Sequence, residues 1–194
     1  MTRVIAGAVG GRRLATPAGR DTRPTADRVR EALFSTLDSL TDLDGCHFVD
    51  LFAGSGAVGI EAASRGAARV LLVESDPKAA RVARENVATV GLGRIVTVSP
   101  SPVASVLPGG PPAGVAADVI FLDPPYAMGE DELGAVLSGL VGHGWLAPSA
   151  VLAVERSSRS PEPAWVPGLT GERSRRYGET MLWYGRAAVG PDLR

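Results

Sequence analysis

Four consecutive residues combine a carboxylate, two prolines and an aromatic ring: Asp123, Pro124, Pro125 and Tyr126. The exocyclic amine of a nucleobase is a poor nucleophile because its lone pair is delocalised into the ring, so it needs acceptors that bind its hydrogens. The Asp123 carboxylate and the Pro124 carbonyl can be those acceptors, and consecutive prolines hold the direction of the carbonyl. Tyr126 offers a face for stacking a base. The motif therefore predicts alkylation of a base amine, with Asp123, Pro124 and Tyr126 as catalytic residues; a proline-stiffened loop without chemistry is the alternative.

A second motif, residues 50–59, is rich in glycine and reads Asp-Leu-Phe-Ala-Gly-Ser-Gly-Ala-Val-Gly. Its glycines allow a tight turn and close approach to a ligand, and Gly54, Gly56 and Gly59 also satisfy the dinucleotide-binding fingerprint. Glu74, further along, could hold ribose hydroxyls in either class of protein. Asp50 separates the classes, because its carboxylate would attract the ammonium of a methionine moiety and repel a pyrophosphate. The motif thus favours S-adenosylmethionine over a nicotinamide cofactor, with a ligand-free tight turn as the alternative.

The two motifs together predict direct in-line transfer of a methyl group from the sulfonium to the amino nitrogen, without a covalent enzyme intermediate. The base must be flipped out or single-stranded, because an amine inside a duplex cannot reach the donor. Cys46 is the single cysteine, so no internal disulfide can form, and no Cys/His cluster has metal-ligand spacing. We therefore expect Cys46 to pack in the core, and we expect no metal.

Arginine is concentrated at the start of the chain, although the formal net charge is only -1. Residues 1–30 hold seven arginines against two aspartates. Guanidinium groups match phosphate oxygens, so this segment is a candidate RNA-binding surface; a solubilising surface is the alternative. The candidate substrate-binding residues are Arg12, Arg13, Arg23, Thr25, Arg28 and Tyr126. A second basic group consists of Arg156, Arg159, Arg173, Arg175 and Arg176.

Strand and helix patterns alternate from residue 47 onward, which is typical of a parallel sheet covered by helices. Strands are expected at residues 47–52, 69–75, 94–98, 118–123 and 151–155. Helices are expected at 57–65, 77–90 and 130–141, and a closing antiparallel hairpin at 173–185. The Pro/Gly-rich stretch that follows the third strand, up to about residue 114, is expected to be a mobile loop.

The N-terminal segment has its own pattern. Residues 3–8 and 12–16 alternate in polarity around Val9-Gly10-Gly11, which predicts a β-hairpin. Thr25 is the expected N-cap of a following helix, whose apolar face would consist of Val29, Leu33, Leu37 and Leu40. We expect three parts: a hairpin and helix extension over 1–40 that binds RNA and covers the cofactor, a catalytic domain over 41–186, and a flexible tail over 187–194. No apolar stretch is long enough to span a bilayer, and a single cysteine fits a reducing compartment, so we expect a cytoplasmic protein without a membrane partner. We also expect a monomer.

The chain also resembles a known family, the bacterial 16S ribosomal RNA guanine-N2 methyltransferases of the RsmD type. The blocks that carry the resemblance are residues 3–7, 11–14, 23–34, 50–59, 64–67 and 123–126, in that family's order. The resemblance implies an α/β, Rossmann-like class I S-adenosylmethionine-dependent methyltransferase fold. Such a fold has a mostly parallel seven-stranded sheet with a closing antiparallel hairpin, here preceded by the small N-terminal extension. It further implies methylation of guanine 966 of 16S rRNA on an assembling 30S subunit.

By this similarity, Asp50, Gly54 and Gly56 would line the methionine end of the cofactor and Glu74 its ribose. Asp123 and Tyr126 would meet the target base, and the loop of residues 23–25 would close over the cofactor or the RNA. Residues 98–103 read Val-Ser-Pro-Ser-Pro-Val where a polar side chain often contacts the adenine, so Ser101 is assigned there, with backbone groups as the alternative. The complete cofactor-binding set is Asp50, Phe52, Gly54, Ser55, Gly56, Glu74, Ser75, Ser101 and Asp123.

Other functions remain compatible with parts of this pattern. A DNA adenine-N6 methyltransferase would use the same acceptor chemistry, although the chain leaves little room for a separate DNA-recognition domain. A methyltransferase acting on glutamine amides in proteins is less consistent with the arginine-rich start. A noncatalytic RNA-binding assembly factor would not need the acidic residues Asp50, Glu74 and Asp123, and a nicotinamide oxidoreductase has no use for Asp-Pro-Pro-Tyr.

Overall fold

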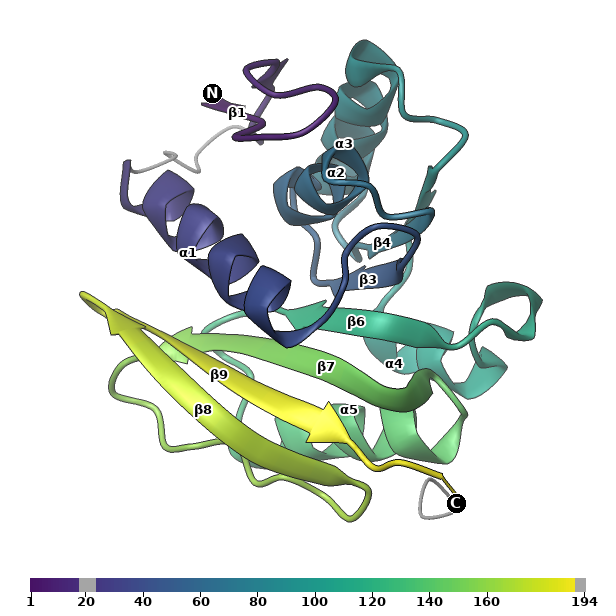
Figure 1. The fold of residues 1–194 in the computed structure, drawn as a ribbon, viewed down its shortest axis with the longest axis vertical. Coiled ribbons are helices and arrows are strands. Elements are labelled where there is room, and N and C mark those ends of the chain that lie inside the picture. The colour runs from purple at the N-terminus through teal and green to yellow at the C-terminus, as the bar shows by residue number, and fades with distance from the viewer. Residues whose placement is uncertain (18–23, 191–194) are drawn as a thin grey trace. The chain divides into compact units, whose positions relative to one another are not determined.

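The computed structural model describes residues 1–17 and 24–190, and the chain forms two compact units, Met1–Pro102 and Val103–Arg194. The fold is α/β (Figure 1). Its seven-stranded sheet is mostly parallel and includes a closing antiparallel strand pair, as the sequence predicted. Over the described residues, no helix is both long and apolar enough to cross a membrane. The division into parts at residues 40 and 186 stays a prediction.

The first unit contains three parallel strands in the order β5-β4-β3. The central residues of β3 and β4 are buried and almost all apolar, as expected for strands that are covered on both faces, whereas Thr97 of β5 is exposed. Helices α2 and α3 connect them as crossovers between parallel neighbours. The bounds are β3 His47–Leu51, α2 Ala57–Ser64, β4 Arg69–Val73, α3 Pro77–Val90 and β5 Val96–Ser99.

Helix α1, Pro24–Leu40, belongs to the same unit. It begins at Pro24, which suits a first helical turn, so Thr25 lies inside the helix and the prediction of Thr25 as its N-cap is wrong. Leu33 and Leu37 are buried on its apolar face, as predicted, and so is Phe34. The Phe34 ring stacks on that of Phe48 in β3, with centroids 6.1 Å apart. This contact anchors the helix to the sheet of its unit.

The N-terminal hairpin is shorter than predicted. Strand β1 is Thr2–Arg3 and strand β2 is Arg13–Leu14, paired antiparallel with Thr2 opposite Leu14. The amides of Ile5 and Ala6 donate to the Glu61 carboxylate of α2 instead of to an opposing strand. The ladder therefore ends early, because α2 takes the donors that a longer hairpin would need.

The second unit contains four strands in the order β6-β7-β9-β8. Strands β6 and β7 are parallel, whereas β7, β9 and β8 form the antiparallel part, so the predicted closing hairpin is confirmed. The element bounds are α4 Val103–Val106, η1 Leu107–Gly109, η2 Pro112–Gly114, β6 Ala117–Leu122, α5 Glu130–Gly142, β7 Leu146–Ser157, β8 Leu169–Tyr177 and β9 Thr180–Ala187.

The prediction of a mobile loop up to residue 114 is wrong. Short helical turns, α4, η1 and η2, occupy residues 103–114. Val103 and Leu107 are buried, and the indole Nε1 of Trp145 donates to the Leu107 carbonyl at 2.9 Å. Two buried apolar side chains and one buried hydrogen bond thus hold this segment in place. Its prolines and glycines interrupt the hydrophobic periodicity from which a helix would be predicted.

Candidate functional site

The glycine-rich loop connects β3 to α2 in the first unit. Phe52 adopts a φ of 67°, in the left-handed region that a bulky residue rarely occupies, and Gly54 and Gly56 also have positive φ. The loop is closed by the Gly56 amide, which donates to the Ala53 carbonyl at 2.9 Å. Strained backbone of this kind persists where the surrounding structure fixes it, and it is concentrated at ligand-binding sites.

Glu74, at the end of β4, fixes this loop. Its Oε2 atom accepts from the Gly54 amide at 2.7 Å, and its Oε1 atom accepts from the Asp76 amide at 2.8 Å. The side chain is half-buried, while the neighbouring Ser75 is exposed. A carboxylate has about four lone-pair sites, so acceptor capacity remains for two vicinal hydroxyls. The position suits the predicted role toward a ribose.

Asp50, the last residue but one of β3, is 1% exposed. Its Oδ2 atom accepts from the Gly59 amide at 3.1 Å, in the first turn of α2. The first amides of a helix have no partner within the helix and carry partial positive charge, so a buried carboxylate is stabilised there. Asp50 therefore orients the start of α2, in addition to the predicted role toward an ammonium group.

The glycines at the start of α2 serve packing. A Cβ built on Gly56 would lie 2.7 Å from Leu72 Cδ1, and one built on Gly59 would overlap Leu72 Cδ2 and lie 2.9 Å from Val70 Cγ1. Both positions need glycine because α2 lies directly on β4. Gly56 therefore packs against β4, and its predicted place in the cofactor site stays a prediction; Gly59 has the packing role of the last glycine of such fingerprints.

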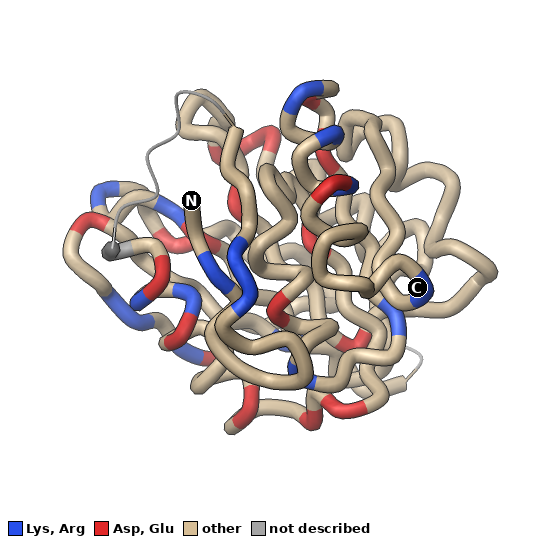
Figure 2. Tube along the Cα trace, turned by 90° about the horizontal axis from the view of Figure 1, so that it is seen from above, with Lys and Arg blue, Asp and Glu red and all other residues tan. Residues whose placement is uncertain are grey.

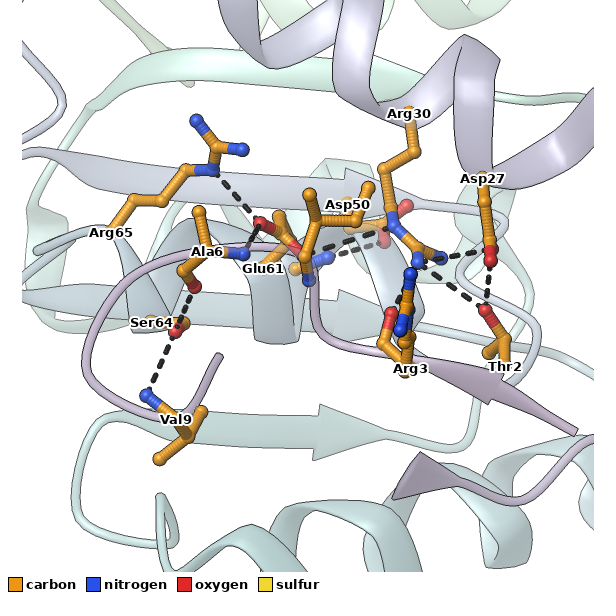
Figure 3. Close-up of polar contacts among 12 residues, drawn as sticks. Thr2, Arg3, Ala6, Val9, Asp27, Arg30, Asp50, Glu61, Ser64 and Arg65 are labelled. Atoms are coloured by element: carbon orange, nitrogen blue, oxygen red, sulfur yellow. Dashed lines mark hydrogen bonds and ion pairs between the residues drawn. The ribbon is translucent and has the colours of Figure 1, made fainter. Parts of the chain in front are cut away.

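Glu61 of α2 is the centre of a buried polar network that sequence reasoning did not identify (Figure 3). The side chain is 0% exposed, and its oxygens accept from the amides of Ile5 at 2.7 Å and Ala6 at 3.0 Å. Arg65 Nε donates at 2.9 Å, and Arg30 Nε lies 3.8 Å away. The available signal was one glutamate in a helix of otherwise small or apolar residues, Ala57–Ser64. Glu61 thus ties the N-terminal segment to the helix that follows the glycine loop.

Arg30 of α1 extends this network and is 6% exposed. Its Nη2 atom donates to Thr2 Oγ1 and to Asp27 Oδ1, each at 3.2 Å, and to the Arg3 carbonyl (Figure 3). Burial lowers the pKa of its guanidinium, while Asp27 and Glu61 counteract that shift. Arg30 therefore holds β1 on α1 and is not part of an exposed basic surface.

The candidate substrate-binding arginines of the N-terminal segment differ in their surroundings. Arg12, Arg13 and Arg28 are exposed, and Arg12 Nη1 donates to the Thr89 carbonyl at 3.4 Å. Figure 2 shows basic and acidic residues interspersed along the chain, and α1 itself carries both signs of charge. Arg23 and the side chain of Thr25 lie outside the described residues. Exposed guanidinium groups are therefore present at three of the predicted positions.

In the second unit, the Asp-Pro-Pro-Tyr motif follows the carboxyl end of β6, as predicted. Asp123 is exposed and Pro124 is buried. The Met128 amide donates to the Pro125 carbonyl at 2.9 Å, which closes the turn. Tyr126 is 90% exposed, so its ring is available for stacking on a base.

Glu155 of β7 lies beside Asp123. The parallel register pairs Leu122 with Val154, so Asp123 and Glu155 are the next residues of two neighbouring strands. Burial and the Asp123 charge together raise the pKa of Glu155 to about 8. Sequence reasoning placed Glu155 at a strand end, but only the register brings it to the motif.

The remaining predicted positions are less informative. Ser101 follows β5 and is half-buried, as is Ser55 in the glycine loop. Arg156 is not an exposed cation, because its Nη2 atom contacts Glu130 Oε1 at 2.6 Å and the Met128 carbonyl at 3.1 Å. The other members of the second basic group are exposed: Arg159, Arg173, Arg175 and Arg176.

Sequence comparison places these features in one family. The sequence profile described as "Conserved hypothetical protein 95" matches residues 2–186. "Ribosomal RNA small subunit methyltransferase D" of Escherichia coli is 37% identical over 97% of this chain and 91% of its own length. "Putative rRNA methyltransferase YlbH" of Bacillus subtilis is 35% identical over 92% of this chain and 95% of its own length.

Solved structures of other proteins have a similar fold over nearly the whole chain. "Putative methyltransferase yhhF" from Escherichia coli has a TM-score of 0.83 at 31% identity and covers 96% of this chain and 97% of its own. A Salinibacter ruber RNA methyltransferase in complex with S-adenosyl-L-homocysteine shares the fold, with a TM-score of 0.62 at 19% identity over 90% of this chain and 99% of its own. The fold is therefore the expected Rossmann-like class I methyltransferase fold, and the chain belongs to the RsmD family.

Proposed function

We propose that this protein transfers a methyl group from S-adenosylmethionine to the exocyclic N2 amine of a guanine in small-subunit ribosomal RNA. The observation that carries the proposal is the 37% identity, over 97% of the chain, to a relative named ribosomal RNA small subunit methyltransferase D. The complete Asp-Pro-Pro-Tyr motif, with Asp123 and Tyr126 exposed, supports it. The resemblance makes guanine 966 of 16S rRNA on an assembling 30S subunit the specific target.

The residues of the glycine loop fit S-adenosylmethionine as the methyl donor. The Glu74 carboxylate, already fixed by two backbone amides, retains acceptor sites for the ribose hydroxyls. The strained loop from Phe52 to Gly56, which follows the buried carboxyl group of Asp50, is proposed to hold the methionine end. When bound, the donor supplies an electrophilic methyl group on a sulfonium. Ser55, Ser75 and Ser101 are proposed to complete this site.

The motif after β6 prepares the amine. The Asp123 carboxylate and the Pro124 carbonyl accept its two hydrogens, and the Tyr126 ring stacks on the base. The bound donor would supply its methyl group to the nitrogen lone pair, and its sulfur would keep the electron pair of the carbon–sulfur bond. The alkylated amine would release its extra proton to water. The protein contributes orientation and needs no covalent intermediate.

RNA binding is assigned to the exposed arginines Arg12, Arg13 and Arg28, together with Arg23 and Thr25. Guanidinium groups bind phosphate oxygens at any sequence, so these residues would supply affinity while the motif after β6 selects the amine. A reducing cytoplasm suits an RNA substrate and a single cysteine, and we expect a monomer.

The test is methyl transfer by the purified protein from radiolabelled S-adenosylmethionine. Asp123→Ala should lower the rate on small-subunit RNA by roughly a hundredfold or more, because an orienting partner of the reacting group is lost. Asp131→Ala, an exposed acidic residue of α5, is the matched control and should leave the rate unchanged. Full turnover by Asp123→Ala would refute the assigned chemistry, provided that calorimetry shows donor binding in both variants.

A further inference from the structure

We propose that Glu155 is a positioning residue for the amine-binding motif: it keeps a proton beside Asp123, so that the pair carries one negative charge and that charge stays on Asp123. The inference rests on the proposed function, in which Asp123 accepts hydrogens from the base amine. It adds a residue that neither the motif nor the resemblance identifies. Glu155 would act through Asp123 and would not touch the base.

The register of the second unit carries the argument. Strands β6 and β7 run parallel, and Val119 to Leu122 pair in step with Val151 to Val154. The chain positions that follow, Asp123 and Glu155, therefore emerge at the same edge of the unit's sheet, on strands roughly 4.8 Å apart. The Asp123 charge acts on Glu155 directly. Two carboxyl groups at this separation resist being ionised together, because like charges raise each other's proton affinity.

Among the described residues of this unit, those in register with Glu155 on β9 and β8 place no cation next to it. On β9 its paired residue is Leu182, which is fully buried. Arg175 of β8 pairs with Leu182, so it is in register with Glu155 but two strands away. The two backbones are roughly 10 Å apart there, and the Arg175 side chain is exposed. Tyr184 of β9, opposite Ala153, lies on the same face two residue pairs along the ladder. An ionised Glu155 would thus have a carboxyl group in register on β6 and an apolar side chain in register on β9.

Arg156, the cation that follows Glu155 in the sequence, is directed away from it. Arg156 points to the opposite face of β7, since side chains alternate along a strand. Its Nη2 atom is held by Glu130 Oε1 of α5 at 2.6 Å and by the Met128 carbonyl at 3.1 Å. Burial, followed by the Asp123 charge, accordingly raises the pKa of Glu155 to about 8 from an ordinary value of 4.5. The raised pKa favours a neutral Glu155 next to Asp123 at neutral pH.

A neutral Glu155 would orient the Asp123 carboxylate that accepts hydrogens from the base amine. A neutral carboxyl group can donate its hydrogen to one oxygen of Asp123 and leave the other oxygen as an acceptor. Above the pKa of Glu155, the second negative charge repels Asp123 and removes the donor that orients it. The plot of methylation rate against pH should then have an alkaline limb, in which the rate falls as Glu155 loses its proton. A neutral isostere of glutamate at position 155 should remove that limb.

The decisive experiment is the pH dependence of single-turnover methylation of small-subunit RNA by wild type, Glu155→Gln and Glu155→Ala. The wild-type rate should fall above about pH 8. Glu155→Gln should keep a near wild-type rate at pH 7 and lose this limb, whereas Glu155→Ala should be slower at every pH, with the KM for S-adenosylmethionine unchanged in both. Glu132→Gln, an exposed residue of α5, is the matched control and should retain the limb. An unchanged limb in Glu155→Gln would overturn the inference.

A second readout does not need activity. The Glu155 carboxyl carbon, followed by NMR in the full-length protein, should titrate near pH 8, and Asp123→Asn should lower that midpoint because the like charge is gone. A midpoint near 4.5, or one that Asp123→Asn leaves in place, would contradict the inference. If the titration is as expected but no RNA is methylated, the proposed function is what fails.

Discussion

The amide of Gly54 donates a 2.7 Å hydrogen bond to Oε2 of Glu74, twenty residues further along the chain. The bond joins the loop after β3 to the end of β4, and the Asp76 amide occupies the other carboxylate oxygen at 2.8 Å. Two backbone donors therefore hold Glu74 in one orientation before a ligand arrives. A carboxylate fixed in this way loses little conformational entropy when it binds a ribose.

Replacing Glu74 by Ala should weaken binding of S-adenosylmethionine by roughly tenfold to a hundredfold, the cost of losing charge-assisted hydrogen bonds. Isothermal calorimetry measures the change. Glu85→Ala removes an exposed glutamate of α3 that is not assigned to the cofactor site; it is the control and should leave the affinity unchanged. Equal affinity of Glu74→Ala and wild type would remove Glu74 from the site.

Gly59 should tolerate no side chain. In Gly59→Ala the new Cβ would overlap Leu72 Cδ2 and crowd Val70 Cγ1, so the free energy of unfolding should fall by roughly 1–3 kcal/mol. Gly134→Ala places the same substitution in α5, where nothing lies within 4 Å, and it should raise stability by roughly 0.5–1 kcal/mol. Denaturant unfolding of both variants distinguishes a packing glycine from a merely flexible one. Equal stabilities would be inconsistent with direct contact between α2 and β4.

Glu61→Ala should detach the N-terminal segment from α2. It leaves the amides of Ile5 and Ala6 and the buried Arg30 without this carboxylate, and breaking a buried ion pair costs roughly 3–5 kcal/mol. Hydrogen exchange of the Ile5 and Ala6 amides should accelerate before global unfolding. The control is Glu85→Ala, which removes an exposed partner of Arg81 and should change stability by roughly 1 kcal/mol or less. Slow exchange of both amides in Glu61→Ala would argue against the anchor.

Arg13→Ala should reduce RNA affinity and also its dependence on salt. If Arg13 contacts one phosphate, the slope of log affinity against log salt concentration becomes shallower by roughly 0.7. Arg84→Ala removes an exposed arginine of α3 that is not assigned to RNA binding, and it should leave the slope unchanged. Filter binding at several salt concentrations measures both. Wild-type binding that is indifferent to salt would contradict the phosphate contacts.

The regular elements were predictable where local signals mark their ends. Pro77 favours the first helical turn, and Gly91 adopts a φ of 75° at the C-cap, so the predicted bounds of α3 are those observed. The central strands were predictable because buried parallel strands are almost continuously apolar. Both motifs also follow strand ends, as expected.

What the sequence could not reveal depends on contacts between distant residues. The hairpin stops after two pairs because Glu61, more than fifty residues away, accepts the Ile5 and Ala6 amides. Residues 103–114 are ordered because Leu107 accepts a hydrogen bond from Trp145, which no local periodicity encodes. Glu155 meets Asp123 only through strand register, and a one-residue shift would put it on the opposite face.

Mass mapping of small-subunit RNA shows whether this protein methylates a guanine amine in that RNA. Small subunits from cells lacking the protein should be incubated with the purified enzyme and labelled S-adenosylmethionine, then digested and sequenced by mass spectrometry. N2-methylguanine should appear at a single position and should be absent when Asp123→Ala replaces the wild type. Label in DNA adenine or in protein, with none in this RNA, would contradict it.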